Sequence, residues 1–390
     1  MRLLLSCLLF TLLVIGCKKN TDVTADPANP TPTPTLPMGT VIGKVVAANN
    51  TTPVRNAVVF ISYGSTIYHT YTDVSGQFSL KAPAGQRVLN IQSGSGRIFR
   101  TQMNITVEAN QVLPVSSDAV RLTQVASLAY VYGIYDEIQT ILMDSLGYNA
   151  SAINYNDLHS LNTMSQYNAI FINCSSGIQV DWLQDSLLAS YVANGGSLYV
   201  SDWAVSTLIG TPAGSCPAPR PGGFIPDSKL CTQKIGNSGM LFNASIVSPS
   251  LQTYLNKNIM DVRYDLGSWE SIMNYDTAFW EVMVKHPATN APLLIRTSNF
   301  TNATAGNINI GGTANTNMVT ICHKPQGSSP ITLTIPVSDL AFHMAHGDSM
   351  GSCSSANGAG RIYFTTFHTE PNGLISPDMK HILDYIILNL

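Results

Sequence analysis

The stretch from 168 to 201, NAIFINCSSGIQVDWLQDSLLASYVANGGSLYVS, decides the fold of the larger part of the chain. It holds two short runs that are apolar almost throughout, 169–173 and 197–201, and between them a segment with helical spacing, 180–193. Strands of a parallel sheet are covered by helices on both faces, so they are apolar along their whole length. The stretch therefore predicts a strand–helix–strand unit of a parallel, doubly wound α/β sheet.

The same alternation continues on both sides of this unit. A strand over 127–132 precedes a helix over 136–146, whose apolar residues recur every three or four positions before Gly147, a residue type that commonly ends helices. Near the other end, a strand over 361–367 precedes a helix over 376–390. This pattern predicts an α/β domain of the doubly wound (flavodoxin-like) type over 125–390.

Two insertions interrupt the α/β alternation, at about 211–290 and about 307–357. Strands expected over 261–265, 280–285 and 292–298 either extend the sheet or form a lid over it. Trp269, Tyr275 and Trp280 are candidates to line a cleft in this region, or are ordinary core aromatics.

Residues 39–122 follow another pattern, in which short runs alternate apolar with polar residues and are separated by turn residues. Such runs without a helical period predict a small antiparallel β-sandwich. The expected fold class is therefore multidomain, with this sandwich followed by the α/β domain and its insertions.

Four motifs of the sandwich segment resemble the carboxypeptidase regulatory-like domain, a prealbumin-like sandwich related to carbohydrate-binding folds: Gly43–Val46, Pro53–Val59, Thr72–Leu80 and Pro83–Gly85. We expect a hairpin turn at Asp73–Gly76 and a positive φ at Gly85. The resemblance implies a structural or adhesive domain without catalytic residues. Three tyrosines are candidates for a sugar-stacking face or simply cover the sheet: Tyr63, Tyr68 and Tyr71.

Residues 1–17, MRLLLSCLLFTLLVIGC, combine one positive charge with an apolar run that is too short to span a membrane. They predict a signal peptide, and the sequence up to Cys17 resembles the bacterial lipobox. That resemblance implies cleavage before Cys17 and attachment of lipid chains such as palmitate to it. The proline-rich segment 18–38 predicts an extended linker. Because Lys18 stands where a retention Asp would signal the inner membrane, we expect an outer-membrane lipoprotein of the cell envelope, facing either the periplasm or the outside.

Charged residues make up only 11% of the 390 residues, whereas 45% are hydrophobic, and the net charge is −3. Disordered chains are rich in charge and poor in apolar residues, so this composition excludes wholesale disorder. Without a basic excess to neutralise phosphates, we expect no nucleic-acid partner.

The segments 167–177, 187–204 and 360–370 resemble the class I glutamine amidotransferase-like superfamily, including its trehalose-utilisation branch. Members of the superfamily that are true amidotransferases carry a nucleophilic Cys on a sharp turn after a strand. This chain has Ser201 and Asp202 there, so glutaminase activity is not expected, although His368 and Glu370 keep the His-x-Glu spacing.

Polar side chains nevertheless follow several predicted strands, and the strand ends of such a sheet meet at one edge. Asp136, Ser201, Asp202, His368 and Glu370 are therefore candidate catalytic or ligand-binding residues. The alternative is structural: Asp136 complements a helix dipole, Ser201 and Asp202 cap the next helix, and His368 bonds within its loop.

Five cysteines remain after Cys7 and Cys17 are set aside. In an oxidising compartment, proximity in sequence favours disulfides of Cys216 with Cys231 and of Cys322 with Cys353, and it leaves Cys174 as a free, inert thiol.

Segment 321–353 resembles a small module of bacterial secreted proteins. A helix starting at Ser338 would carry two of its histidines on one face. Cys322 and Cys353 either form the disulfide or serve as thiolate ligands. With the disulfide in place, zinc or another transition metal would have four candidate ligands: His323, His343, His346 and Asp348.

The expected function is that of a non-catalytic envelope lipoprotein, held on the membrane by its lipid anchor and binding a polar ligand, a glycan or a protein partner. A hydrolase-like enzyme with its site at the strand ends, or a metal-binding surface module, is the alternative. Phosphate loops, dinucleotide fingerprints and metalloprotease helices are not found in the sequence.

Overall fold

The computed structural model describes residues 36–390 except 65, 177, 179–180, 211–222, 299, 301–317, 325–329, 346–347, 351–359 and 370–374. Pro37–Leu390 forms one compact unit. The predicted signal peptide, the lipidation site Cys17 and nearly all of the linker lie outside the described residues. Among the described helices, none is long and apolar enough to cross a membrane.

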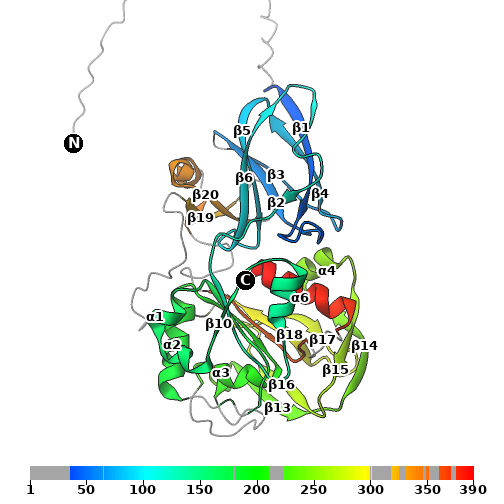
Figure 1. Ribbon diagram of the computed structural model, residues 1–390, viewed down its shortest axis with the longest axis vertical. Coiled ribbons are helices and arrows are strands. Elements are labelled where there is room, and N and C mark those ends of the chain that lie inside the picture. Colours follow the sequence, from blue (N-terminus) through cyan, green and yellow to red (C-terminus); the bar gives the residue numbers. More distant parts are fainter. Residues whose placement is uncertain are drawn as a thin grey trace, which may run out of the picture. The chain divides into compact units, whose positions relative to one another are not determined.

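Two four-stranded sheets make up the N-terminal part of this unit (Figure 1). The strands of the first are β4 (Gln77–Pro83), β1 (Met38–Val46), β7 (Val112–Pro114) and β8 (Val120–Arg121). Those of the second are β3 (Thr66–Tyr71), β2 (Val58–Tyr63), β5 (Gly85–Ser93) and β6 (Phe99–Val107). The prediction of a purely antiparallel sandwich is wrong in one respect, since the short strands β7 and β8 pair in parallel with β1.

The local details of the sandwich agree with its turn residues. Asp73 accepts hydrogen bonds from the backbone N–H groups of Ser75 and Gln77, both at 2.8 Å, and so holds the hairpin turn before β4. Gly85 has a φ of 109°, a conformation that favours glycine. Of the candidate sugar-stacking tyrosines, Tyr63 and Tyr71 are exposed, and the guanidinium of Arg87 lies 4.3 Å from the Tyr63 ring.

A nine-stranded mixed sheet forms the second part, in the order β10-β9-β11-β12-β22-β18-β17-β14-β15. Its parallel half contains β10 (Ser151–Ile153), β9 (Leu128–Val131), β11 (Ala169–Ile172), β12 (Ser197–Ser201) and β22 (Ile362–Thr365). Its antiparallel half contains β18 (Pro292–Thr297), β17 (Glu281–Lys285), β14 (Gly239–Ile246) and β15 (Ile259–Tyr264). The expectation of a wholly parallel sheet therefore holds for only half of it, and strands of the first insertion extend the sheet instead of forming a lid.

Helices cover both faces of the parallel half, as its apolar strands require (Figure 1). On one face, Ile170, Leu198 and Val200 pack with Leu188 and Val192 of α2 (Trp182–Ala193). On the other face, strand residues such as Phe171 and Tyr199 share a core with α6 (Pro377–Asn389) and α4 (Pro249–Leu255).

The helix expected over 136–146 is shorter and of another type. It is a π-helix, η1 (Thr140–Ser145), in which the N–H of Leu146 bonds to the carbonyl of Ile141, five residues back. The apolar residues that predicted it are buried all the same. Because this helix starts late, Asp136 lies before it rather than in its first turn.

Several shorter elements lie outside these sheets. Short helical turns are η2 (Tyr155–His159), α1 (Leu161–Met164), η3 (Asp202–Val205) and α3 (Ser206–Ile209). A two-stranded sheet pairs β13 (Leu230–Ile235) with β16 (Trp269–Tyr275). The second insertion forms β19 (Met318–His323), β20 (Ile331–Pro336), η4 (Val337–Asp339), α5 (Leu340–Ala345) and β21 (Ser349–Met350).

The three-stranded sheet β20-β19-β21 packs on the sandwich. Ile321, Leu333 and Ile335 form a separate core with Val58 and Phe60 of β2. The helix predicted to start at Ser338 begins instead at Leu340, because Ser338 lies inside η4 and donates to its neighbour Asp339.

Candidate functional site

The carboxyl ends of β9, β11, β12 and β22 meet at one edge of the sheet, where ligands of doubly wound folds commonly lie. Four of the five candidate strand-end residues lie there, and all four are buried: Asp136, Ser201, Asp202 and His368. Glu370 lies outside the described residues. The structure thus brings four of the candidates to one sheet edge, and their pairing could not be read from the sequence.

Asp136 is bonded within the protein rather than presented to solvent. It accepts hydrogen bonds from the hydroxyls of Ser201 and Thr369 and, at 3.1 Å, from the Thr369 N–H. The Ser201 oxygen in turn accepts from the Cys174 N–H at 2.9 Å. Ser201 is the N-cap residue of η3, but its side chain makes no capping hydrogen bond and its hydroxyl is already bonded to Asp136, which connects the ends of three strands.

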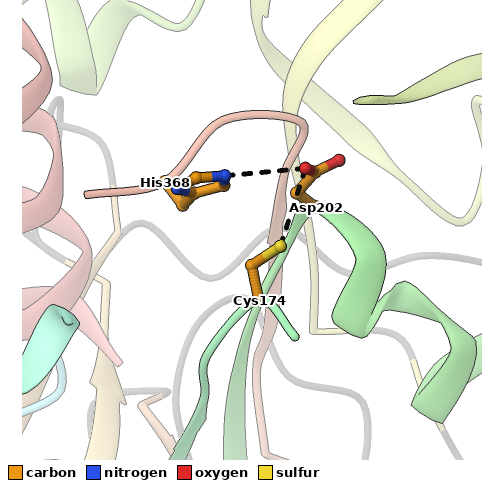
Figure 2. A group of neighbouring side chains, drawn as sticks. All are labelled: Cys174, Asp202 and His368. Atoms are coloured by element: carbon orange, nitrogen blue, oxygen red, sulfur yellow. Dashed lines mark hydrogen bonds and ion pairs between the residues drawn. The ribbon is translucent and has the colours of Figure 1, made fainter. Parts of the chain in front are cut away.

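A second group gathers around Asp202, and Figure 2 shows Cys174 and His368 both directed at its carboxylate. One oxygen of Asp202 lies 3.7 Å from His368 Nε2 and 3.7 Å from Cys174 Sγ. The other oxygen accepts from the Glu270 N–H at 2.7 Å. His368 also bonds through Nδ1 to the carbonyl of Thr369, within its own loop, as the structural alternative expects.

Burial governs the protonation of this group. It raises the pKa of Asp202 to about 7, against the opposing effect of His368. Burial would lower the pKa of His368, but the carboxylates of Asp136 and Asp202 raise it above its ordinary value. Burial and Asp202 together raise the pKa of the Cys174 thiol well above the usual range. Cys174 is free and buried, and it is a protonated thiol near neutral pH, not a nucleophile.

Asp202 also has an unusual backbone, with a φ of 42° at the turn between β12 and η3. The other non-glycine residues of positive φ in the described part of the chain are all asparagines. A buried residue keeps such a conformation when its surroundings determine it, here through the hydrogen bond from Glu270. The sequence carried no signal for Glu270, which comes from the first insertion.

We call Asp136, Cys174, Ser201, Asp202 and His368 the strand-end group. Through the bond from Glu270 to Asp202, this group holds the strand β16. The Glu270 carboxylate accepts from the Thr232 hydroxyl on β13 at 2.7 Å, so β13 and β16 are linked by side chains as well as by backbone. Beside Glu270, the ring of Trp269 stacks on that of Tyr264 with centroids 3.9 Å apart. Asp202 thus positions a strand that carries an aromatic side chain.

Trp269 and Tyr275 line a cleft of about 500 Å³ between β16, the end of β13 and the β17–β18 hairpin. Uncharged polar residues line it as well: Ser271, Thr289 and Asn290. His286 lines the cleft too. Trp280 does not belong to this cleft, since it is 2% exposed and packs in the core.

Comparison with known proteins adds little to this geometry. No protein-family model and no curated protein sequence matches the chain. Among solved structures, a ThuA-like protein from Bacteroides uniformis is similar at 10% identity and a TM-score of 0.36, over 67% of this chain and 89% of the other. The exo-β-1,4-mannosidase Op5Man5 from Opitutaceae bacterium strain TAV5 is similar at 10% identity and a TM-score of 0.26, over 56% of this chain and 33% of the other. At these TM-scores neither similarity assigns a function.

The second insertion, whose described part from β19 to β21 we call the histidine module, holds a second polar group. His323, His343 and Asp348 lie together and are buried, whereas His346 lies outside the described residues. Cys322 and Cys231 are both disulfide-bonded, so Cys322 offers no thiolate ligand. Their predicted partners, Cys353 and Cys216, lie outside the described residues, and the two pairings remain predictions.

Proposed function

We propose that this chain is a non-catalytic lipoprotein of the cell envelope and is anchored to the outer membrane through Cys17. We propose further that the protein binds a neutral glycan in the cleft lined by Trp269 and Tyr275. We also propose that 39–122 is a carboxypeptidase regulatory-like domain and 125–390 an amidotransferase-like domain without its nucleophile. The observation that carries the binding proposal is the chemistry of the cleft lining, in which aromatic rings stand beside hydroxyl and amide groups.

The lining favours a sugar over other ligands for two reasons. Aromatic surface suits the C–H face of a sugar ring, and here Tyr275 and the part of Trp269 that is not stacked on Tyr264 would supply it, while hydroxyl and amide groups can bond the sugar hydroxyls. Among the described residues that line the cleft, none is Lys, Arg, Asp or Glu. A charged ligand would meet no carboxylate, ammonium or guanidinium group of opposite charge among these residues, so a neutral ligand fits best.

The state of the strand-end group supports a binding role over catalysis. Asp202 and His368 are 1% and 5% exposed, and the Ser201 hydroxyl is already bonded to Asp136. A substrate would have to displace these internal bonds to reach the group. In our proposal the group therefore serves to hold β16 and its Trp269 in place.

The test is binding of neutral oligosaccharides to the full chain, by glycan array and then by calorimetry. We expect Trp269→Ala and Tyr275→Ala each to weaken binding at least tenfold, and the matched control Tyr132→Ala, an exposed tyrosine outside the cleft lining, to leave it unchanged. Thermal melting shows whether each variant is folded. Failure of the wild type to bind any neutral glycan would overturn the binding proposal.

A hydrolase is the second candidate, because a carboxyl with a pKa of about 7 beside an imidazole suits general acid–base chemistry. Turnover of aryl glycosides or aryl esters would distinguish a hydrolase from a binding protein. Activity in the wild type that is lost in both Asp202→Asn and His368→Ala would replace the binding proposal, and absence of turnover would remove the hydrolase.

The anchor has its own test, which is independent of the ligand. We expect Cys17→Ser to move the protein from the membrane to the soluble fraction and to abolish incorporation of labelled palmitate. Unchanged membrane retention and labelling would exclude Cys17 as the lipidation site.

A further inference from the structure

We propose that His323, His343 and Asp348 bind a divalent transition-metal ion, and that zinc is the ion that suits them best. The proposal concerns the module packed on the sandwich, and it does not depend on the glycan cleft or on the strand-end group. It rests on three side chains that come from separate elements and meet in a buried place.

The three ligand atoms already converge. Asp348 Oδ2 lies 2.8 Å from His323 Nδ1 and 2.9 Å from His343 Nδ1, and all three atoms lie within 4.8 Å of one another. The two imidazole rings stand at 88° with centroids 5.7 Å apart, so they approach the carboxylate from different directions. A ligand set of two imidazoles and one carboxylate is typical of zinc sites with three protein ligands.

The surrounding structure fixes each ligand. His323 ends β19, directly after the disulfide-bonded Cys322, and β19 pairs with both β20 and β21. His343 lies on α5, and its carbonyl accepts from the Asp348 N–H at 3.2 Å. The second oxygen of Asp348 accepts from the Lys324 N–H at 2.8 Å, which turns Oδ2 toward the histidines.

The charge of the group suits a cation. Asp348 is the one acidic side chain of the group, and three nitrogen atoms face its carboxylate: His323 Nδ1, the Lys324 N–H and His343 Nδ1. A carboxylate and two imidazoles in a buried place suit a divalent cation, because attraction between opposite charges is strong where water is excluded.

The required adjustment is small. Bonds of about 2.0–2.1 Å to a tetrahedral zinc ion place neighbouring ligand atoms about 3.3 Å apart, so Asp348 Oδ2 would move about half an ångström away from each histidine Nδ1. Each imidazole would carry its proton on Nε2 and offer Nδ1 to the metal. A bound ion would join β19, α5 and the segment before β21, and it would stabilise the module, because binding free energy adds to folding free energy.

The experiment uses the full chain after treatment with a chelator, and it follows zinc binding by calorimetry and by metal analysis. We expect about one zinc ion per chain and a higher melting temperature with zinc than with magnesium. Cobalt should give the intense visible absorption of a tetrahedral site. Asp348→Asn should weaken zinc binding at least tenfold, as should His343→Gln. His159→Gln is the matched control, because His159 also pairs with an aspartate, Asp181 at 2.9 Å, but lies on the surface.

Two results would overturn the proposal. One is a wild type that neither binds zinc at micromolar concentration nor gains thermal stability from it, which would make the group a hydrogen-bonded His–Asp–His clamp only. The other is unchanged zinc binding in Asp348→Asn. If Asp348→Asn does not fold, the wild-type titration and the cobalt spectrum still decide.

Discussion

At the scale of single residues, the two carboxylates of the strand-end group differ in their hydrogen-bond partners. Asp136 takes hydrogen bonds from Ser201 and Thr369, whereas Asp202 faces His368, Cys174 and the backbone of Glu270. Two carboxylates at one sheet edge therefore have different environments. Asp136 serves as a connector, and Asp202 is the residue whose protonation changes near neutral pH.

This difference predicts how folding stability depends on pH. The folded-state pKa of Asp202 is about 7, above the value near 3.9 of an unfolded chain, so its stabilising effect is complete at low pH and is lost as pH rises toward 7. His368 acts in the same direction, because its raised pKa contributes stability that is lost as pH rises through that pKa. We expect the wild type to be less stable at pH 8 than at pH 5, by on the order of 2 kcal/mol for Asp202 alone.

Urea denaturation between pH 5 and pH 8 measures this dependence. Asp202→Asn should make the wild-type slope distinctly shallower, since Asn cannot ionise. Asp185 and Asp384, whose pKa values burial also raises, to about 6, should keep a residual slope. Asp181→Asn is the control, because the pKa of that exposed carboxyl is lowered by the Gln184 N–H and by His159. An Asp202→Asn variant with the full wild-type slope would contradict the assignment.

At the scale of elements, the end of the π-helix η1 connects the α/β part to the sandwich. Its end is held by contacts with the sandwich, where the Asn49 and Thr52 side chains donate to the carbonyl of Ser145. Gly147 then turns the chain with a φ of 76°. A Cβ at Gly147 would lie 2.7 Å from the backbone nitrogen of Asn49.

We therefore predict that Gly147→Ala destabilises the protein by at least about 1 kcal/mol, from the left-handed backbone alone, and by more from the close approach to Asn49. Thermal or urea denaturation measures the loss. The matched control is Gly267→Ala, where a Cβ would meet nothing within 4 Å and no positive φ is required. Equal stability of the two variants would show that the contact of η1 with the sandwich is not tight.

At the scale of the whole molecule, the core does not divide where the domains were expected to divide. One hydrophobic cluster includes sandwich residues such as Val41 and Phe99 together with Tyr148 and Ile386 of the α/β part. The ring centroids of Tyr148 and Phe99 lie 4.4 Å apart, and the Tyr148 hydroxyl donates to the Leu122 carbonyl at 3.1 Å. The histidine module is tied to the sandwich in a similar way, through Gln92, which bonds the backbone of Thr332 and Thr334.

This continuity predicts that residues 37–390 unfold cooperatively. Calorimetry should show a single transition, because separating the sandwich would expose the apolar surface of Phe99 and Tyr148. Tyr148→Ala should lower the stability of the whole unit and not that of one part. Two well-separated transitions in the wild type would contradict the prediction.

The sequence by itself determined four of the five strands of the parallel half, β9, β11, β12 and β22, and the β-rich character of the N-terminal part, but it did not predict β10 or the π-helical form of η1. Strand β11 is apolar throughout and β12 is apolar between its terminal serines, and the apolar spacing of α2 places that helix to within two residues of its start at Trp182. These signals are local, so they can be read without knowing what packs against them.

Only the tertiary structure decided the rest. The antiparallel half of the sheet, the bond from Glu270 to Asp202 and the packing of the histidine module on the sandwich all join segments far apart in sequence. Such contacts depend on complementary surfaces and on burial, which also sets the pKa of Asp202, and neither is encoded in the spacing of residues along the chain.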